Sequence, residues 1–288
     1  MILEGKTFAT QLRASLAQRA ERVQNCLKRP ITLCAIGSTE DYGAYVYLKK
    51  EVQAAEKLGV KAYVHEVNKN TSVPQFLDLL QKNSLAPDID ALLIARPLPQ
   101  ALAESNYAHF IAPEKDIDGM SNISLGNLFL CKTWEEVKNL NTFVPCTAMA
   151  VLHLLDYHKI SLQGIETAVI GRSSTVGRPL AHLLSCRNAT VKLCHSFTTD
   201  LKTSLQNCQL ICSAVGKAGL LSGHNTPPNS TVIDIATNLD ANGNLCGDAK
   251  WQELTQQGCR VSPVPGGVGP ITLACLLENI ILSGERKL

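Results

Sequence analysis

The sequence predicts an α/β protein made of two domains, each built on a parallel sheet. Short apolar runs alternate with amphipathic helical stretches along most of the chain. A turn-rich, irregular segment at 100–145 interrupts this alternation once, after which it resumes. A length of 288 residues also suits two modest domains better than one. We therefore expect the domain boundary near residues 140–147.

Composition narrows the class of protein. Hydrophobic residues make up 45% and charged residues 18% of the chain, which is typical of a compact protein with apolar cores. The net charge is +2 and the basic residues are scattered, so no nucleic-acid surface is expected. The N-terminus lacks the order of a signal peptide, and no uninterrupted apolar run approaches the roughly 18 residues of a membrane span. We expect a cytoplasmic protein with no nucleic-acid or membrane partner.

The eleven cysteines indicate neither a disulfide framework nor a metal site. Their number is odd, and most lie within apolar runs. The one close pair, Cys208 and Cys212, is spaced unlike a zinc knuckle or a redox C-x-x-C motif. We expect buried free thiols and no bound metal.

The first half of the chain reads as alternating helices and strands. Apolar residues from Phe8 to Leu27 recur at helical spacing and predict a helix over 6–28, ended by Pro30. Further expected elements are strands at 31–36, 61–66 and 91–95, a helix from about 43 to 58, and a helix opened by Pro74. Such alternation implies parallel strands, whose carboxyl ends are where ligands bind.

The second half repeats the pattern. We expect a helix from Thr147 to about His158, with Thr147 as its N-cap. The remaining expected elements are strands at 166–170, 190–194, 209–214 and 231–236, and helices at 176–186 and 271–284.

A glycine-containing turn at residues 169–179 is the first candidate site. An apolar strand ends at Gly171, small polar residues follow, and Gly177 precedes a helical apolar series. The N-terminus of a helix carries unpaired N–H groups and partial positive charge, so it suits a phosphate. The spacing is not that of the G-x-G-x-x-G fingerprint, and a purely structural turn is the alternative.

The second candidate is the stretch 263–270, Pro-Val-Pro-Gly-Gly-Val-Gly-Pro. Its prolines restrict the backbone path, while its glycines permit close approach by a ligand. Such a loop exposes its own N–H and C=O groups. The alternative is a rigid interdomain turn.

Six stretches together resemble the bifunctional methylenetetrahydrofolate dehydrogenase/methenyltetrahydrofolate cyclohydrolase family, of the FolD type. They occur in the family's order, at nearly its spacing, and cover essentially the whole chain. They are Tyr45-Val-x-x-Lys49, Arg96-Pro-Leu-Pro99, Lys115-Asp-Ile-Asp-Gly119, Pro145-Cys-Thr147, Gly171-Arg-Ser-x-x-Val-Gly177 and the 263–270 stretch.

The resemblance implies a folate domain formed by residues 1–142 and 271–288, and a Rossmann-like NAD(P)-binding domain formed by 143–270, with a cleft between them. It implies oxidation of 5,10-methylene-tetrahydrofolate to the methenyl form with NADP, NAD being possible, and hydrolysis of that product to 10-formyl-tetrahydrofolate. It also implies a homodimer.

The resemblance assigns roles to individual residues. Tyr45 and Lys49 are four apart on a predicted helix and share one face, where the tyrosine would stack on folate and the lysine would assist hydrolysis. Asp118 would hold the pterin ring, whose amino and amide groups are donors to a carboxylate. These three are the candidate catalytic residues. The candidate substrate loop consists of Pro265, Gly266 and Gly267.

The cofactor residues follow in the same way. The family's pyrophosphate turn corresponds to Gly171, Arg172, Ser173 and Gly177. Ser196 lies where a ribose or 2′-phosphate would be met, and Thr237 would lie near the nicotinamide. Arg172 can pair with a 2′-phosphate, so we favour NADP. Phe197, where a basic residue is usual, weakens that preference.

Two departures concern the hydrolytic step. Ala95 occupies the place of a family glutamine that orients the catalytic lysine. The interval from Gly37 to Gly59 is two residues longer than usual, and a loop insertion at 38–43 would put Tyr47 and Glu51 at the tyrosine and lysine positions. We prefer the literal match, Tyr45 and Lys49. Oxidation is more secure than hydrolysis, and the alternatives are a dehydrogenase-only paralogue or a catalytically silent nucleotide- or folate-binding relative.

Overall fold

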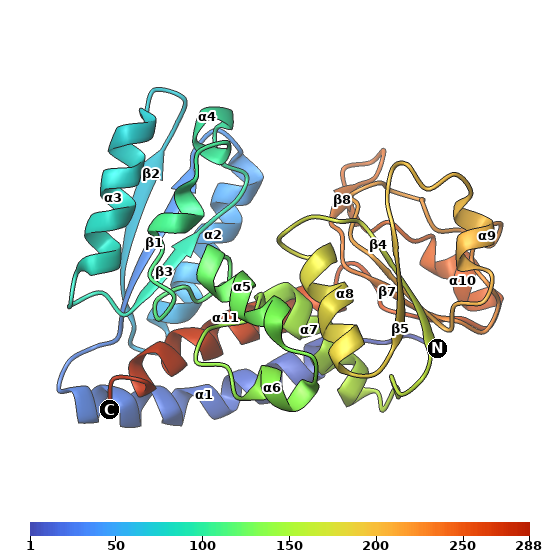
Figure 1. Ribbon diagram of the computed structural model, residues 1–288, viewed down its shortest axis with the longest axis horizontal. Coiled ribbons are helices and arrows are strands. Elements are labelled where there is room, and N and C mark those ends of the chain that lie inside the picture. The colour runs from blue at the N-terminus through green and yellow to red at the C-terminus, as the bar shows by residue number, and fades with distance from the viewer. The chain divides into compact units, whose positions relative to one another are not determined.

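The computed structural model describes residues 1–288 and divides them into two compact units, each with its own parallel sheet (Figure 1). The N-terminal unit comprises residues 12–127, 141–144 and 276–288, and the C-terminal unit comprises 1–11, 128–140 and 145–275. Helices α1 (Lys6–Leu27) and α11 (Val268–Glu285) contribute residues to both units. The predicted two-domain α/β class is confirmed.

The sheet of the N-terminal unit has the strand order β2-β1-β3, all parallel. Its strands are β1 (Thr32–Ser38), β2 (Lys61–Val67) and β3 (Ala91–Ile94), each within one or two residues of the prediction at either end. The central strand β1 is buried along its whole length. Leu33 pairs with Ala62 on one side and Ala91 on the other, so the three strands end near one edge.

Two helices cover this sheet. Helix α2 (Tyr42–Glu56) begins at the N-cap Asp41, whose carboxylate accepts from the Ala44 N–H. Helix α3 (Val73–Leu85) begins with a capping box formed by Ser72 and Gln75. An apolar cluster joins α3 to β1 and β3 through Phe76, Leu80, Cys34, Ile36 and Leu92. Helix α2 lies on the other side of the sheet (Figure 1).

The segment 100–145 is not irregular throughout, and that expectation is wrong in part. It contains α4 (Gln100–Ala103), the 3₁₀ helix η1 (Tyr107–Phe110), α5 (Asn122–Leu130) and α6 (Trp134–Lys138). Hydroxyl caps start the two later helices: the Ser121 hydroxyl accepts from the Ser124 N–H, and the Thr133 hydroxyl accepts from the Glu136 N–H. The abundance of turn-forming residues hid these short helices.

The sheet of the C-terminal unit has the order β10-β7-β6-β4-β5, again all parallel. Four of its strands and helix α8 lie close to their predicted positions. Its elements are α7 (Cys146–Tyr157), β4 (Glu166–Ile170), α8 (Gly177–Cys186), β5 (Thr190–Cys194), α9 (Leu201–Leu205), β6 (Leu210–Ser213), β7 (Thr231–Asp234), β8 (Asn238–Leu239), β9 (Leu245–Cys246), α10 (Trp251–Gln256) and β10 (Arg260–Val261).

Two helix starts differ from the expectation. Thr147 does not cap α7, because Pro145 occupies the N-cap position and Thr147 is already inside the helix. Helix α11 starts at Val268, within the glycine- and proline-rich stretch. Helix α11 is also long and apolar enough to cross a membrane, but more than half of it is buried in the protein, as in the core helix of a globular domain.

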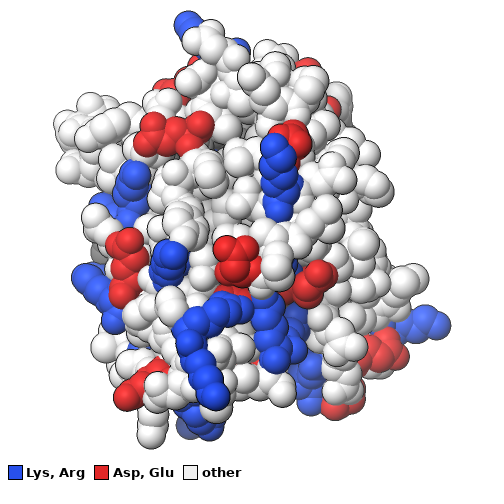
Figure 2. Space-filling model, turned by 90° about the vertical axis from the view of Figure 1, so that its left-hand side faces the viewer, with Lys and Arg blue, Asp and Glu red and all other residues white.

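All eleven cysteines are free thiols, as expected. Nine are buried, whereas Cys26 is exposed and Cys246 is half-buried. No group of three or more metal-binding side chains occurs in the described chain. Acidic and basic side chains are interspersed on the face that Figure 2 shows.

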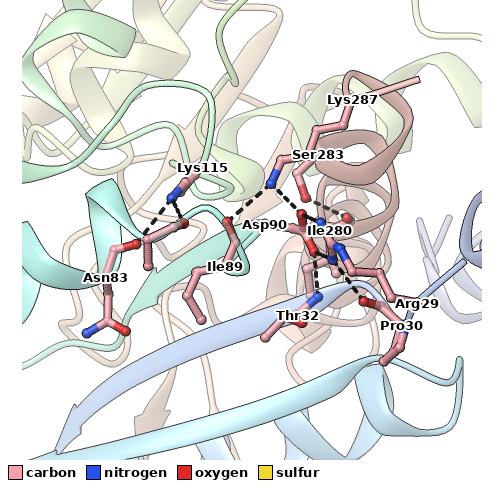
Figure 3. Close-up of polar contacts among 11 residues, drawn as sticks. Arg29, Pro30, Thr32, Asn83, Ile89, Asp90, Lys115, Ile280, Ser283 and Lys287 are labelled. Carbon is pink, nitrogen blue, oxygen red and sulfur yellow. Dashed lines mark hydrogen bonds and ion pairs between the residues drawn. The ribbon is translucent and has the colours of Figure 1, made fainter. Parts of the chain in front are cut away.

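A buried ion-pair network fixes the C-terminus of the chain to the start of β3 (Figure 3). The Asp90 carboxylate is fully buried and accepts from Arg29 at 2.6 and 2.8 Å and from the Thr32 N–H at 2.8 Å. The Lys287 ammonium donates to the same carboxylate at 2.5 Å. Burial opposes ionisation, but the hydrogen bonds from Arg29 and Lys287 outweigh it and lower the pKa of Asp90.

We predict that Asp90→Asn lowers the free energy of unfolding by about 3 kcal/mol at pH 7, because it leaves a buried ion pair incomplete. The lowered pKa means that this contribution is present above the unfolded-state pKa and is lost as the pH falls through the folded-state value. Urea unfolding of both proteins at several pH values measures it. Asp78→Asn removes an exposed i,i+4 pair with Lys82 and should cost about 0.5 kcal/mol or less. Equal effects of the two substitutions would contradict the assignment.

Candidate active site and family

Asp118 lies at the carboxyl edge of the N-terminal sheet. The segment before it runs parallel to β3, with Asp116 bridged to Leu92 and the Leu92 N–H donating to the Lys115 carbonyl at 2.7 Å. The chain turns directly after this bridge, with the Gly119 N–H donating to the Asp116 carbonyl at 2.8 Å, and Asp118 lies in that turn. Asp118 is half-buried. This edge is where ligands bind in open parallel sheets.

The other polar residues of the Lys115–Gly119 motif hold this segment in place. The Lys115 ammonium donates to the carbonyl oxygens of Ala86 at 2.6 Å and Asn83 at 3.3 Å, at the end of α3 (Figure 3). The buried Asp116 carboxylate accepts from the N–H groups of Met120 and Ser121 at 2.9 and 2.6 Å. The motif thus contains two bracing residues and one acidic residue at the sheet edge.

The structure brings Tyr45 and Lys49 together on α2. The Lys49 ammonium lies 5.0 Å from the centre of the Tyr45 ring, and the Tyr45 hydroxyl donates to Glu66 on the edge strand β2. The hydrogen bond to Tyr45 is the main cause that raises the pKa of Lys49. These three side chains form a group between α2 and β2. The catalytic role of Lys49 stays a prediction.

Glu51 lies within electrostatic reach of Asp118. Glu51 belongs to the buried face of α2, together with Leu48, Val52 and Ala55, and is only 9% exposed. Burial, followed by the negative charge of Asp118, raises the pKa of Glu51 to about 8. Two residues correspond to about 200° of helix rotation, so positions 49 and 51 point in different directions.

The ends of β1 and β3 are closely packed beneath α2. A Cβ atom on Gly37 would lie 2.4 Å from Leu48 Cδ2, and 3.5 Å from the Ala95 Cβ. The Arg96 side chain turns to Tyr107, donating to its hydroxyl at 3.0 Å. Beyond these strand ends lies a hollow of about 400 Å³, lined by Ser38, Glu40, Asp41, Tyr42, Pro97, Leu98 and Pro99.

In the C-terminal unit, the predicted phosphate turn is a tight strand-to-helix connection between β4 and α8. Gly171 has a φ of +111°, and a Cβ there would lie 2.7 Å from the Ala214 carbonyl oxygen. A Cβ on Gly177 would lie 2.0 Å from the Gly171 carbonyl oxygen. The Ser173 hydroxyl accepts from the Val176 and Gly177 N–H groups at the helix start. This tight turn at the positive end of α8 fits a dinucleotide pyrophosphate.

Arg172 and Phe197 come together beside this turn. The Arg172 guanidinium lies 5.7 Å from the centre of the Phe197 ring, which is 79% exposed. The His195 Nδ1 accepts from the Phe197 N–H at 3.2 Å and shapes the turn after β5. Ser196 is exposed in that turn, and β5 pairs with β4. The predicted ribose-side residues are thus neighbours.

A loop that sequence reasoning missed follows β6, the other neighbour of β4. The buried Asp248 carboxylate accepts from the N–H groups of Val215 at 2.9 Å and Lys217 at 2.7 Å. It also accepts from the Asn238 amide at 3.1 Å, which holds the backbone next to the exposed Thr237. The sequence feature that could have indicated this loop is Gly216, which follows the apolar run of β6.

A second buried aspartate supports the first. The Asp234 carboxylate accepts from the N–H groups of Asp248 and Ala249 at 3.0 and 2.8 Å. Burial raises the pKa of Asp234 to about 6, although these hydrogen bonds oppose the shift. The carboxyl ends of β6 and β7 are therefore held by an acidic pair whose partners are mainly backbone amides.

The stretch 263–270 packs against the start of the chain. The Gly5 N–H donates to the Gly266 carbonyl at 2.8 Å, and a Cβ on Gly5 would lie 2.2 Å from the Gly267 carbonyl oxygen. Gly266 has a φ of +109°, which side chains rarely adopt. These contacts give the glycines a packing function. The ligand-binding roles of Pro265, Gly266 and Gly267 stay predictions.

The N-terminal segment also extends the sheet of this unit. The Leu3 N–H donates to the Val261 carbonyl at 2.9 Å, and the Val261 N–H donates to the Met1 carbonyl at 3.0 Å. This parallel pairing covers the edge strand β10. It joins residues that are about 260 positions apart in sequence, which no local pattern signals.

Comparisons with known proteins agree with this geometry. Residues 3–118 match the model of the tetrahydrofolate dehydrogenase/cyclohydrolase catalytic domain, and residues 145–288 match that of its NAD(P)-binding domain. The bifunctional protein FolD of Elusimicrobium minutum is 49% identical over the full length of both chains.

Solved structures agree as well. The chain resembles bifunctional FolD of Campylobacter jejuni with a TM-score of 0.92 and 30% identity, covering 100% of this chain and 99% of the other. It resembles FolD of Trypanosoma brucei, solved with NADP cofactor and inhibitor, with a TM-score of 0.89 and 26% identity over 100% and 98% of the chains. Both halves of the sequence, both sheets and full-length relatives agree, and the chain belongs to the tetrahydrofolate dehydrogenase/cyclohydrolase family.

Proposed function

We propose that this protein oxidises 5,10-methylene-tetrahydrofolate to 5,10-methenyl-tetrahydrofolate with a nicotinamide cofactor, and hydrolyses the product to 10-formyl-tetrahydrofolate. The observation that carries the proposal is the full-length match to bifunctional relatives, 49% identical in one case. The two halves match the catalytic and NAD(P)-binding domains of the family separately.

On the folate side, Asp118 is the residue that the sheet edge presents for the pterin ring. A carboxylate accepts hydrogen bonds, and the pterin offers an amino and an amide donor. Lys115 and Asp116 are committed to backbone contacts and hold the turn that contains Asp118. Their bracing fixes the orientation of a bound ring, which is the main requirement for hydride removal.

On the cofactor side, the turn between Gly171 and Gly177 would hold the pyrophosphate. A bound nicotinamide cofactor supplies the hydride acceptor. The loop at 214–217 and Thr237 would line the nicotinamide end, because β6 lies next to β4 in the sheet and β7 lies next to β6. Asp248 keeps that loop in one conformation through its hydrogen bonds to two backbone amides.

We further propose NADP as the preferred cofactor, through Arg172. The guanidinium lies over the Phe197 ring beside Ser196, at the end of β5, the strand on the ribose side of the turn. A guanidinium binds a phosphate through paired, charge-assisted hydrogen bonds. Phe197 can orient the guanidinium without neutralising it.

The reaction itself is tested with purified protein, 5,10-methylene-tetrahydrofolate and either NADP or NAD. We expect the near-ultraviolet absorbance of the methenyl product to rise with NADP and then to decay faster than in an enzyme-free control. Persistent methenyl absorbance would mean oxidation without hydrolysis. Binding of both ligands without any methenyl product would contradict the proposal and favour a silent relative.

The phosphate turn is tested with Gly177→Ala. The added methyl group would meet the Gly171 carbonyl oxygen at 2.0 Å, so the turn must open. We expect the Kd of the cofactor, measured by calorimetry, to rise about 10-fold or more, because the turn no longer presents one phosphate-binding geometry. Gly126→Ala is the matched control, since nothing lies within 4 Å of its added Cβ. Unchanged cofactor affinity in a folded Gly177→Ala protein would refute the assignment.

Cofactor preference is tested with Arg172→Ala. Loss of a charge-assisted phosphate contact should raise the KM for NADP about 10-fold or more and leave the KM for NAD nearly unchanged. Lys202→Ala, which removes an exposed positive charge from α9, controls for the general field of the surface. An equal effect on both cofactors would show that Arg172 does not read the 2′-phosphate.

A further inference from the structure

The loop after β6 turns its hydrogen-bond donors inward. The fully buried Asp248 carboxylate accepts from the Val215 and Lys217 N–H groups at 2.9 and 2.7 Å, and from the Ser213 hydroxyl at 2.7 Å. It also accepts from the Asn238 side-chain amide at 3.1 Å. Four donors fill the capacity of one carboxylate, so the loop and the Asn238 side chain are held in one arrangement.

The acceptors of the same loop face the other way. In a trans peptide the C=O points opposite to the N–H, and the Lys217 N–H points to Asp248. The carbonyl of the same peptide, that of Gly216, therefore points away from Asp248. Residues 215–218 are exposed, and no group of the chain donates a hydrogen bond to the Gly216 carbonyl. The loop thus presents an acceptor to its surroundings and keeps these two donors inside.

The Asn238 side chain presents a second acceptor in the same neighbourhood. A carboxylate only accepts hydrogen bonds, so the group of Asn238 that faces Asp248 is its NH2, and its Oδ1 is left for another partner. A Cβ atom on Gly216 would lie 3.8 Å from this Oδ1, and no group of the chain donates to it. Asn238 is half-buried at the start of β8. Two acceptor oxygens without a partner therefore accompany the carboxyl ends of β6 and β7.

This arrangement selects the chemistry of a ligand. A loop that binds phosphate points its N–H groups outward, whereas here two of them are spent on Asp248. Outward oxygen atoms suit a ligand that brings N–H donors, and they disfavour a carboxylate or a phosphate. Strand β6 flanks β4 on the side opposite β5, the ribose side, so the part of a dinucleotide that reaches this loop carries the nicotinamide. Its carboxamide has one NH2 group, with two N–H donors.

We propose that the Gly216 carbonyl and the Asn238 Oδ1 bind the NH2 group of the nicotinamide carboxamide, and that Asp248 is the positioning residue that aims both. This inference rests on the proposed function, because it requires a nicotinamide cofactor at this edge of the sheet. It adds the chemical feature by which the chain recognises the reactive ring, an uncharged amide with N–H groups. Holding that amide fixes the orientation of the ring that accepts the hydride.

Analogues of NADP test this recognition in the unchanged protein, through Kd values measured by calorimetry. The thionicotinamide analogue keeps the NH2 group, the 3-acetylpyridine analogue has a methyl group in its place, and the nicotinic acid analogue has a carboxylate oxygen there. We expect the thionicotinamide analogue to bind about as tightly as NADP, the 3-acetylpyridine analogue about 10-fold more weakly, and the nicotinic acid analogue about 100-fold more weakly. A 3-acetylpyridine analogue that binds as tightly as NADP would overturn the proposal.

Asn238→Ala removes one of the two acceptors and leaves Asp248 its three other donors. We expect it to weaken NADP binding about 5-fold and to leave the Kd of the 3-acetylpyridine analogue nearly unchanged, because that analogue has no N–H to lose. Asn242→Ala, an exposed substitution in the β8–β9 hairpin, should change neither Kd. Equal weakening of both dinucleotides by Asn238→Ala would show that Asn238 does not bind the amide, and would overturn its assignment.

Asp248→Asn tests the positioning role, because an asparagine offers one acceptor oxygen where the carboxylate offers two. We expect the preference for NADP over the 3-acetylpyridine analogue to fall from about 10-fold to about 2-fold, while the Kd of 2′,5′-ADP, which lacks the nicotinamide, stays within about 2-fold. Asp240→Asn, exposed in the same hairpin, is the matched control. A folded Asp248→Asn protein with the original preference would overturn the positioning role. Failure of the proposed oxidation would instead appear as absence of methenyl product although the analogues bind in the expected order.

Discussion

The parallel register of the strands is the constraint on which the rest of the structure depends. In both sheets every strand runs in the same direction, so the connections that follow the strands emerge at one edge. Asp118 and Ala95 reach that edge in one unit, and the turns after β4, β5, β6 and β7 reach it in the other. Residues far apart in sequence thereby become neighbours, although no local sequence pattern predicts that they will meet.

Buried aspartates hold these edges and strand starts by accepting hydrogen bonds from groups that would otherwise lack partners. Asp90 binds Arg29, Lys287 and a backbone amide at the start of β3. Asp116, Asp234 and Asp248 accept mainly from backbone N–H groups of the connecting loops. A satisfied buried carboxylate is rigid, because each of its hydrogen bonds would be costly to lose.

The two candidate sites differ in how their residues are fixed. The turn between β4 and α8 requires its two glycines, because a Cβ on Gly171 or Gly177 would collide with backbone oxygen atoms. In the N-terminal unit, burial controls an ionisable group instead, since desolvation and then the charge of Asp118 raise the pKa of Glu51 to about 8. The first can be read from residue identity, whereas the second depends on which side of a helix is buried.

The sequence by itself determined the α/β class, the order of the main strands and helices, the phosphate turn and the motif around Asp118. These depend on short-range periodicity, on glycine and proline, and on motif spacing, all of which are local. It did not determine the pairing of Met1–Leu3 with β10, because that pairing joins residues distant in the chain. It also missed the short helices within 100–145, whose turn-forming residues hid them, and it placed the cap of α7 two residues too late. The tertiary structure alone decided that Glu51 belongs to the buried face of α2, whereas the Lys49 ammonium lies over the Tyr45 ring. Two positions on one helix differ by about 200°, and only the sheet beneath α2 selects which of them is buried.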